Sequence, residues 1–488
     1  MNETIRQLEP RNLWNYFADI NAIPRASKKE EKIVSFVKNL SERLGLPTHV
    51  DEVGNVIIKK PASSGMQDRA TVVLQSHLDM VHQKNADTDF DFATQGIDMF
   101  VDGDWVKAKG TTLGADNGIG VATILALLAS SDIPHPPLEA LFTIDEETGM
   151  TGALSLKGGL LQGNILLNLD TEEDNELTIG CAGGMDVTVK GSYREVHPKG
   201  NVAYQISLTG LTGGHSGTEI HLGRGNANKL MNRFLYHMSK QFPMELSSLK
   251  GGSLRNAIPR ESFAIVVIEE ANSAKLEKEV ALFLTILLSE YKFTDPDLKF
   301  SMVNVETPEN VLDADFQKKL IGSIYACPNG IYRLTPAILD LVQTSNNVAK
   351  IEVSKGKFAI DCLTRSSVNS EKQDIASAIT ACFEVLQGEV TFGGSYPGWV
   401  PKPDAPIVQL MRNVYKELFH DEAHVYACHA GLECGILGTN YPNMQMISFG
   451  PTIRGAHSPD ERVQISSVQK FWKYLLETLQ RIPESSNG

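Results

Sequence analysis

The sequence predicts an α/β protein in which a mixed sheet flanked by helices is interrupted by an inserted α+β domain. Two observations lead to this fold class. Short apolar segments at 71–75, 138–144 and 164–169 surround an apolar helical segment at 118–129, which is typical of a sheet covered on both faces. From about residue 186 onward, alternating strands and amphipathic helices replace this pattern.

The first domain is expected to begin with helices. Residues 12–45 show helical periodicity in two segments, and Ser27 with Glu30 three places later forms a capping-box pattern before the second. A pair of strands is expected around Gly54. We assign residues 1–186 to the first part of this domain.

The inserted α+β domain is expected to span residues 187–395, and the recurrence of its pattern suggests two modules of similar design within it. Its expected strands are 186–190, 203–208, 262–268, 349–353 and 357–363, and its expected helices are 226–240, 276–291 and 371–386. The glycines of segment 393–398 predict a hinge.

The remaining chain, residues 396–488, is expected to complete the first domain. Helices are predicted at 407–419 and 468–482, and strands at 424–427 and 444–449. The first domain is therefore built from chain on both sides of the insertion.

Bulk properties limit the classes of function. The formal charge of −14 is spread along the 488 residues, which argues against a nucleic-acid partner and favours small substrates. The sequence starts without a secretory signal pattern, and no apolar run reaches the roughly 18 residues that a membrane span needs. Six sparse cysteines without a Cys-x-x-Cys pair fit a reducing compartment. We expect a cytoplasmic protein without a membrane partner.

Five short segments each place a histidine or an acidic residue at the end of an apolar run. They are QSHLD at 75–79, GADNG at 114–118, DEETG at 145–149, NLDT at 168–171 and GAHSP at 455–459. Two imidazoles and three carboxylates are the ligand set that a pair of zinc ions prefers, and further carboxylates remain to transfer protons. Each segment alone also has a simpler interpretation as a cap, a turn or a solvated strand end.

The local chemistry of these segments favours the metal interpretation. His77 and Asp79 are two residues apart on a strand and share a face, so the carboxylate can orient the imidazole. Asp116 lies between glycines, where it could cap a helix or bridge two metals about 3.5–4 Å apart. Glu146 and Glu147 are neighbours, so one can bind metal while the other acts as a base.

In this order, and with Gly-Gly-His-Ser-Gly at 213–217 in the insertion, the segments resemble the di-zinc metallopeptidase family of aminoacylases, carboxypeptidases and dipeptidases. The resemblance covers almost the full length and is strongest to the bacterial Xaa-His dipeptidases. It implies a di-zinc exopeptidase-like catalytic domain with an inserted lid or dimerisation domain, and a homodimer. The implied activity is hydrolysis of dipeptides with a free amino terminus, including carnosine-type Xaa-His substrates, through a water activated by two zinc ions.

The resemblance also implies a role for each residue of the metal site. One zinc is held by His77 and Asp170, a second by Glu147 and His457, and Asp116 bridges both. Cobalt or manganese are the alternatives to zinc. The peptide bond between Asp116 and Asn117 is implied to be cis.

Three further residues are implied to take part in catalysis. Glu146 is the general base, Asp79 orients His77, and His215 in the insertion stabilises the oxyanion. Because the insertion is roughly twice as long as in simpler relatives, His215 acts either across a dimer or within one chain.

The candidates for substrate binding are Asn256, Arg365 and Glu433. Asn256 and Arg365 are expected to hold the C-terminal carboxylate, although a structural salt bridge is an alternative for Arg365. Glu433 is a candidate for the free ammonium group.

Three other functions remain as alternatives. The same metal site could serve an N-acyl amino acid amidohydrolase, or the chain could be a non-enzymatic, metal-stabilised binding protein. A serine mechanism is disfavoured because the segment at 214–217 lacks the Gly-x-Ser-x-Gly elbow.

Overall fold

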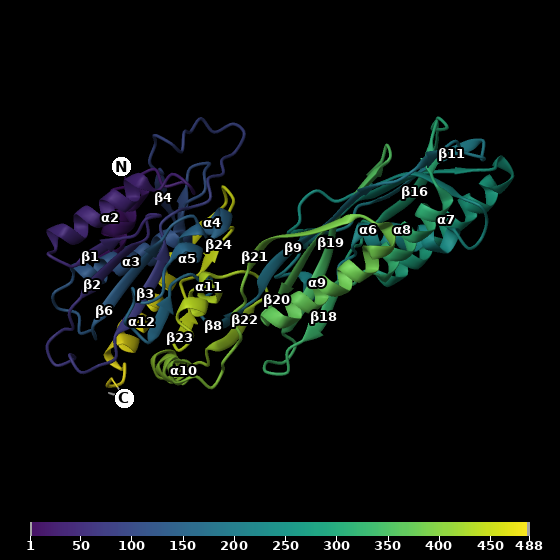
Figure 1. Ribbon diagram of the computed structural model, residues 1–488. Coiled ribbons are helices and arrows are strands. Elements are labelled where there is room, and N and C mark those ends of the chain that lie inside the picture. The colour runs from purple at the N-terminus through teal and green to yellow at the C-terminus, as the bar shows by residue number, and fades with distance from the viewer. Residues whose placement is uncertain (1, 486–488) are drawn as a thin grey trace. The chain divides into compact units, whose positions relative to one another are not determined.

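The computed structural model describes residues 2–485 and divides into two compact units (Figure 1). Unit 1 contains the described residues up to Gly180, together with Pro401–Ala427 and the chain from Leu432 onward. Unit 2 contains Cys181–Val400 and Cys428–Gly431. Both chain ends therefore belong to unit 1.

Unit 1 is built on an eight-stranded sheet in the order β1-β2-β6-β3-β7-β23-β8-β22. The strands are β1 (Thr48–Val50), β2 (Val56–Lys60), β3 (Val72–His77), β6 (Leu138–Thr143), β7 (Ile165–Asn168), β8 (Glu176–Cys181), β22 (His424–Cys428) and β23 (Gln445–Ser448). Strand β3 is parallel to β6 and β7, and β23 is parallel to β7, whereas β1 and β2 run antiparallel to their neighbours. The sheet is mixed, as predicted.

Helices flank this sheet. They are η1 (Ile5–Gln7), α1 (Arg11–Asn21), α2 (Glu31–Arg43), α3 (Ala115–Ala129), α4 (Glu146–Gly149), α5 (Thr151–Ser155), α10 (Pro406–Phe419), α11 (Glu433–Asn440) and α12 (Ile465–Gln480). Helix α3 packs against α1 and β3, and α10 packs against α12 and β23. Every residue of β3, β6 and β7 is buried, which explains why apolar residues predominate in these strands.

A second, four-stranded sheet in unit 1 was not predicted. It has the order β24-β25-β5-β4 and consists of β4 (Met99–Asp102), β5 (Trp105–Ala108), β24 (Ile453–Arg454) and β25 (Arg462–Gln464). These strands are only two to four residues long, so they carry little periodicity for a sequence pattern to reveal. The sheet joins chain from before and after the insertion.

The predicted capping box before α2 is wrong. The helix begins at Glu31, and Glu30 makes no side-chain capping bond. Ser27 instead donates to Asp79, and Glu30 accepts the backbone N–H of Asp145. A buried carboxylate and a buried backbone N–H need partners more than a solvated helix end does, so both side chains turn toward them.

Unit 2 is built on one nine-stranded sheet in the order β16-β11-β15-β13-β19-β20-β9-β21, with β18 also paired to β19. The strands are β9 (Gly183–Ser192), β11 (Val202–Thr209), β13 (Glu245–Gly251), β15 (Ser262–Ile268), β16 (Lys299–Val305), β18 (Gly330–Leu334), β19 (Val342–Ser354), β20 (Lys357–Ser366) and β21 (Glu389–Tyr396). Two small pairs join β10 (Glu195–Val196) to β17 (Val311–Leu312) and β12 (Gly214–His215) to β14 (Ala257–Ile258).

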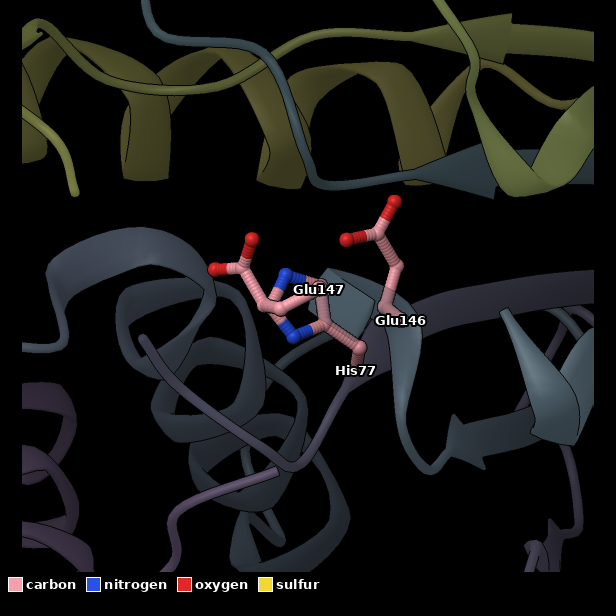
Figure 2. A group of neighbouring side chains, drawn as sticks. All are labelled: His77, Glu146 and Glu147. Carbon is pink, nitrogen blue, oxygen red and sulfur yellow. The ribbon is translucent and has the colours of Figure 1, made fainter. Parts of the chain in front are cut away.

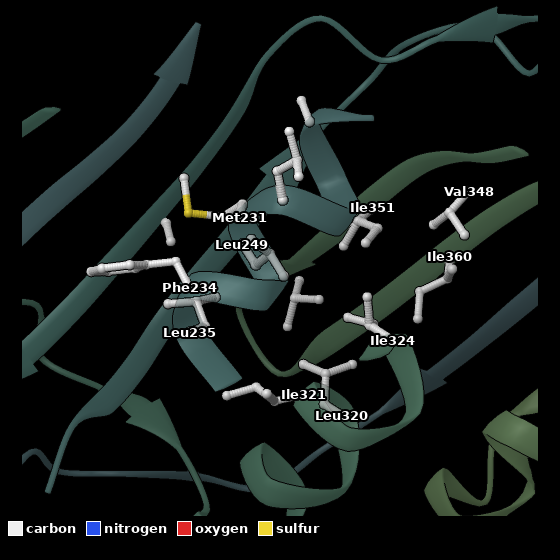
Figure 3. Packing of buried hydrophobic residues seen from close by; sticks show 14 of the residues in the cluster. Met231, Phe234, Leu235, Leu249, Leu320, Ile321, Ile324, Val348, Ile351 and Ile360 are labelled. Carbon is white, nitrogen blue, oxygen red and sulfur yellow. The ribbon is translucent and has the colours of Figure 1, made fainter. Parts of the chain in front are cut away.

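The helices of unit 2 share one apolar core with its sheet. They are α6 (Ala227–Met238), α7 (Ser273–Glu290), α8 (Ala314–Ala326) and α9 (Asn369–Phe383), with short turns η2 (Ile220–Leu222), η3 (Glu270–Asn272) and η4 (Glu384–Leu386). Figure 3 shows residues of α6 and α8, among them Phe234 and Ile321, meeting Leu249 of β13 and Ile351 of β19. The pairing of β13 with β19 makes the sheet continuous, so the insertion is one domain. Its two halves, β16-β11-β15-β13 and β19-β20-β9-β21, have mirrored strand orders, which agrees with two modules of similar design.

The predicted hinge at 393–398 is also corrected. Gly393 and Tyr396 belong to β21, which pairs with β9. The glycines are accommodated by a register shift in the strand between these two residues, because glycine tolerates the irregular backbone of a bulge. Across residues 2–485, none of the helices combines the length and apolarity required to cross a bilayer.

Candidate metal centre

The sheet of unit 1 brings three of the five sequence segments together. Strand β3 ends at His77, β6 ends just before Asp145, and β7 ends two residues before Asp170. Because these three strands are parallel neighbours, their carboxyl ends lie at the same edge of the sheet. Side chains far apart in sequence therefore meet there.

The five residues predicted to bind metal form two adjoining groups that share Asp116. In the first group, Nε2 of His77 lies 3.1 Å from Oδ1 of Asp116 and 3.5 Å from Oδ1 of Asp170. In the second, Nε2 of His457 lies 3.3 Å from Oδ2 of Asp116 and 3.0 Å from Oε2 of Glu147. The ligand atoms within each group are all within 4.8 Å of one another.

The segment carrying Asp116 has an irregular backbone. Gly114 has a φ of 69°, which favours glycine, and the peptide bond between Asp116 and Asn117 is cis. The Asn117 amide donates to the carbonyl of Leu169, 2.6 Å away, and also to Asp170. The side chain of Asp116 thereby faces His77 on one side and His457 on the other.

The carboxylate of Asp79 organises the strand ends beneath this centre. It lies 3.2 Å from Nδ1 of His77 and accepts the backbone N–H groups of Glu146 and Glu147 at 3.1 and 3.2 Å. Although burial raises its pKa, the hydrogen bonds from His77 and Ser27 lower the pKa of Asp79 below its usual value. An ionised Asp79 therefore fixes both the imidazole and the turn that carries the two glutamates.

Glu146 and Glu147 project from the start of α4 beside His77 (Figure 2). Burial raises the pKa of Glu146 well above its usual value, and the carboxylates of Asp170, Glu147 and Glu433 raise it further, whereas His77 lowers it. Oε1 of Glu147 is buried without a hydrogen-bond partner among the described residues. Glu146 is therefore a buried carboxyl group beside the donor groups, and Glu147 has one oxygen that the described chain does not engage.

The charge balance of the site fits divalent cations. Burial raises the pKa of Asp170 to about 6, and Asp116 and Glu147 raise it as well. Crowded, buried carboxylates repel one another and need compensating positive charge. The mixture of imidazole and carboxylate donors, with one carboxylate common to both groups, suits a metal site.

Glu433 lies below the same edge of the sheet and is fully buried. Its Oε2 accepts hydrogen bonds from Gln75 and Thr143, both at 2.6 Å, whereas its Oε1 has no partner among residues 2–485. Burial raises the pKa of Glu433 to about 7. One carboxylate oxygen is therefore engaged by the protein, and the other is buried without a partner in the described chain.

The remaining three predicted site residues belong to unit 2 and lie near one another. His215 pairs with Ala257, the residue after Asn256, and the carbonyl of Asn256 accepts the N–H of Ser216. Nη2 of Arg365 lies 3.5 Å from Nε2 of His215. Arg365 is 4% exposed, and within the described residues no carboxylate lies within 4.0 Å of its guanidinium, which argues against the salt-bridge alternative.

Four residues around these sites were missed from the sequence. Tyr396 accepts a hydrogen bond from Arg365, and burial raises the pKa of Glu172 to about 8 beside Asp116 and Asp170. Arg25 and Glu461 bind the backbone near Asp116. Spacing gave a weak signal for two of them, since Glu172 follows Asp170 by two residues and Glu461 follows His457 by four.

Two imidazoles and several carboxylates lie together at the edge of a mixed sheet. This is the kind of site that metal-dependent hydrolases use. The model of one family, described as peptidase family M20/M25/M40, matches residues 73–481. The chain belongs to this family.

Two relatives are similar over essentially the whole chain. The sequence is 42% identical over 480 residues to the cytosol non-specific dipeptidase of Escherichia coli, covering 98% of this chain and 99% of that protein. The structure matches the crystal structure of aminoacylhistidine dipeptidase from Vibrio alginolyticus with a TM-score of 0.93 and 43% identity, covering 100% of both chains. A tripeptidase from Staphylococcus aureus shares the fold, with a TM-score of 0.60 and 16% identity over 97% of this chain and 99% of the other.

Proposed function

We propose that the chain is a metal-dependent dipeptidase that hydrolyses dipeptides with a free amino terminus, including Xaa-His dipeptides. The observation that carries this proposal is the pair of donor groups sharing Asp116, with Glu146 beside them. The two relatives similar over the full chain are described as a cytosol non-specific dipeptidase and an aminoacylhistidine dipeptidase, which supports the same substrate class.

Two zinc ions are the proposed cofactors, with cobalt or manganese as substitutes. His77 and Asp170 would hold one ion, Glu147 and His457 the other, and Asp116 would contact both. When bound, such a pair polarises a peptide carbonyl and lowers the pKa of water. Asp79 keeps the His77 ring oriented through its contact with Nδ1, so that Nε2 faces the centre.

Glu146 is proposed to transfer the proton. Its carboxylate lies beside His77 and Glu147, where it can accept a proton from water and pass it to the leaving amine. The backbone N–H of Glu146 is held by Asp79, which restricts the position of the carboxylate. A positioned acid–base group of this kind typically contributes a factor of about 10²–10⁴ to the rate.

His215 is proposed to stabilise the oxyanion. Nδ1 of His215 accepts the backbone N–H groups of Gly217 and Thr218 at 3.2 and 3.0 Å. Because Nδ1 accepts, the ring proton is placed on Nε2, and this tautomer can donate a hydrogen bond to a developing negative charge.

Arg365 and Asn256 are proposed to bind the C-terminal carboxylate of the substrate. The guanidinium of Arg365 is buried without a carboxylate partner in the described chain, and its Nε has no hydrogen-bond partner there. A buried, uncompensated cation favours an anionic ligand. Glu433, whose buried Oε1 has no partner in the described chain, is the proposed partner of the free ammonium group.

The test is metal removal followed by a substrate panel. Treatment with a chelator should abolish hydrolysis of β-alanyl-histidine, and added Zn²⁺ should restore it. Dipeptides should then be cleaved faster than tripeptides and N-acetylated amino acids. Faster turnover of the acetylated compounds would identify an amidohydrolase instead, and no turnover of any of them by the zinc-loaded protein would favour a binding protein.

We also propose that the protein is a cytoplasmic homodimer. The name of the Escherichia coli relative supports the location. Leu282 and Leu288 of α7 are 50% and 42% exposed, and Tyr325 of α8 is 50% exposed, so these helices carry apolar surface that a second copy could cover. Sedimentation velocity should give twice the chain mass for the wild type, and replacement of Leu282 and Leu288 by serine should give the monomer.

A further inference from the structure

The carboxylate of Glu461 binds four consecutive backbone N–H groups. Oε2 accepts those of Leu113 and Gly114 at 2.7 and 2.9 Å, and Oε1 accepts those of Ala115 and Asp116 at 2.7 and 3.2 Å. The side chain is buried, with 2% exposure. Both oxygens of one carboxylate are thus fully used by the segment that carries Asp116.

These N–H groups belong to the turn 113–116 that leads into helix α3, and because the backbone of Asp116 and Asn117 is not helical, the buried donors of this turn need an acceptor from elsewhere. A side chain at the N-cap usually accepts from them, but the N-cap here is Gly114 and makes no such bond. The acceptor comes from 345 residues further along the chain.

Arg25 holds the same segment through its carbonyl side. Its Nη2 donates to the carbonyl of Gly114 at 2.5 Å, and its Nη1 donates to the carbonyls of Leu78 and Asp79 at 3.1 and 3.0 Å. Burial lowers the pKa of Arg25 to about 10, so the guanidinium stays charged at neutral pH. Arg25 therefore connects the Asp116 segment to the strand end that carries His77.

Glu461 is also close in sequence to His457. The intervening turn is short, with the N–H of Glu461 bonded to the carbonyl of Ser458 at 3.1 Å and Ser458 bonded to Gly455. His457 itself has a φ of 64°, so its backbone is held in an uncommon conformation. A displacement of Glu461 would move the His457 turn relative to Asp116.

We propose that Glu461 is a positioning residue for the metal centre, which fixes the spacing between Asp116 and His457 and so preforms both donor groups before metal binds. The inference rests on the proposed metal site. The carboxylate of Glu461 bonds to backbone N–H groups, including that of Asp116, so it acts through the backbone of the ligands.

The carboxylate is chemically specific in this role. Four N–H donors converge on two oxygens, and the amide of glutamine would replace one of these oxygens with a further N–H donor. Two buried N–H groups would then lose their acceptor, although the shape of the side chain is kept. E461Q therefore tests the charge and the hydrogen bonds of Glu461 while the packing of the side chain is kept.

The test compares E461Q with D460N. Asp460 is exposed and adjacent, and its side chain makes no hydrogen bond or ion pair among those of the described residues, so D460N removes the same charge one position away. Zn²⁺ affinity is measured by competition with a chromophoric chelator, alongside kcat, KM and the thermal midpoint of the metal-free protein. Loss of a group that orients metal ligands typically costs about 10–100-fold in metal affinity or activity.

We expect E461Q to bind Zn²⁺ about 10–100-fold more weakly, and at saturating metal to lower kcat with little change in KM, while D460N matches the wild type. The proposal would be overturned if E461Q bound Zn²⁺ as tightly as the wild type. It would also be overturned if a lowered thermal midpoint were the one change that E461Q shows. If circular dichroism shows that E461Q does not fold, E461D is measured in its place. If neither variant folds even with Zn²⁺ present, Glu461 has a purely structural role and the proposal is wrong. Because the affinity for Zn²⁺ is measured without substrate, the comparison of E461Q with the wild type tests this proposal even if the wild type cleaves no dipeptide.

Discussion

Glu146 and Glu147 are adjacent in sequence but differ in what surrounds each carboxylate. Glu147 lies 3.0 Å from His457 in a donor group that includes Asp116, whereas Glu146 lies beside His77, outside the two groups that share Asp116, and burial raises its pKa well above the usual value. The same substitution at the two positions should therefore have different consequences.

We predict that E146Q lowers kcat by about 10²–10⁴-fold and leaves the bound metal unchanged, because it removes the proton carrier and no proposed ligand. E147Q serves as the matched comparison and should lose metal, because it replaces a proposed ligand oxygen. Steady-state kinetics and metal analysis of both variants check this. Equal metal loss in the two variants would contradict the division of roles.

His429 in unit 2 provides a pH dependence that is independent of metal. Burial lowers the pKa of His429 from 6.5 to about 3, and the nearby Arg365 cation lowers it too. Below about pH 6.5 the unfolded chain binds a proton at this residue and the folded chain does not, so folded-state stability rises with pH across this window. The stability that depends on His429 staying neutral is therefore fully present above pH 6.5 and is lost as the pH falls toward 3.

We predict that H429Q reduces the acid sensitivity of unfolding. Between pH 6 and 4, the free energy of unfolding of the wild type should fall by about 1.4 kcal/mol per pH unit more than that of H429Q. The variant should be less stable at pH 7.5, since Ser345 loses its 2.8 Å partner. Urea unfolding at several pH values measures both effects, with H49Q at an exposed site as the control that should parallel the wild type.

At the scale of elements, the close packing of α3 against the strand ends controls the geometry of the site. A Cβ atom added at Gly120 would overlap the side chains of Ser76 and Asn117 and approach the carbonyl of Leu169 within 2.9 Å. Ser76 and Asn117 hold one another and the Asp170 segment, so any adjustment would spread to the ligands.

We predict that G120A destabilises the protein by about 1–3 kcal/mol and reduces activity, because the added methyl group overpacks a buried contact. Gly322 in helix α8 is the matched control, since a Cβ there would meet nothing within 4 Å. G322A should be neutral or stabilising by up to about 1 kcal/mol. Thermal unfolding of both variants measures this difference. Equal unfolding midpoints for G120A and G322A would contradict the packing argument.

The elements that the sequence predicted are those with strong periodicity. The buried strands β3, β6 and β7 and helix α3 are rich in apolar residues, so their approximate positions followed from hydropathy. The strands β4 and β5 are short and partly exposed, and the predicted hinge is a strand whose partner, β9, lies some 200 residues earlier. Pairing over such distances leaves no local pattern.

The residues of the candidate site also divide into those that the sequence reveals and those that it does not. Metal-binding residue types are few, so His77 and Asp116 stood out from the sequence as candidates. Arg25 and Glu461 bind backbone atoms, and any residue type can supply a backbone N–H or carbonyl. Their partners therefore became visible only in the folded chain.

On the scale of the whole molecule, all five proposed metal ligands belong to unit 1, although the chain of unit 2 is inserted between Asp170 and His457. Metal would therefore join the two parts of unit 1 that the insertion separates. A ligand that binds the folded state stabilises it by about 4 kcal/mol when its free concentration is 1,000 times its Kd. That stabilisation should appear in the unit that provides the ligands.

We predict that adding Zn²⁺ to the metal-free protein slows hydrogen exchange in unit 1 far more than in unit 2. The peptides to follow are those of β3, α3 and β7 in unit 1 and of β11, β15 and β19 in unit 2. Exchange through opening of unit 1 should slow by up to about 10³-fold at that metal excess, because each opening event must release the metal. Equal slowing in both units would show that they unfold as one cooperative structure, and an unchanged unit 1 would remove the metal from its proposed site.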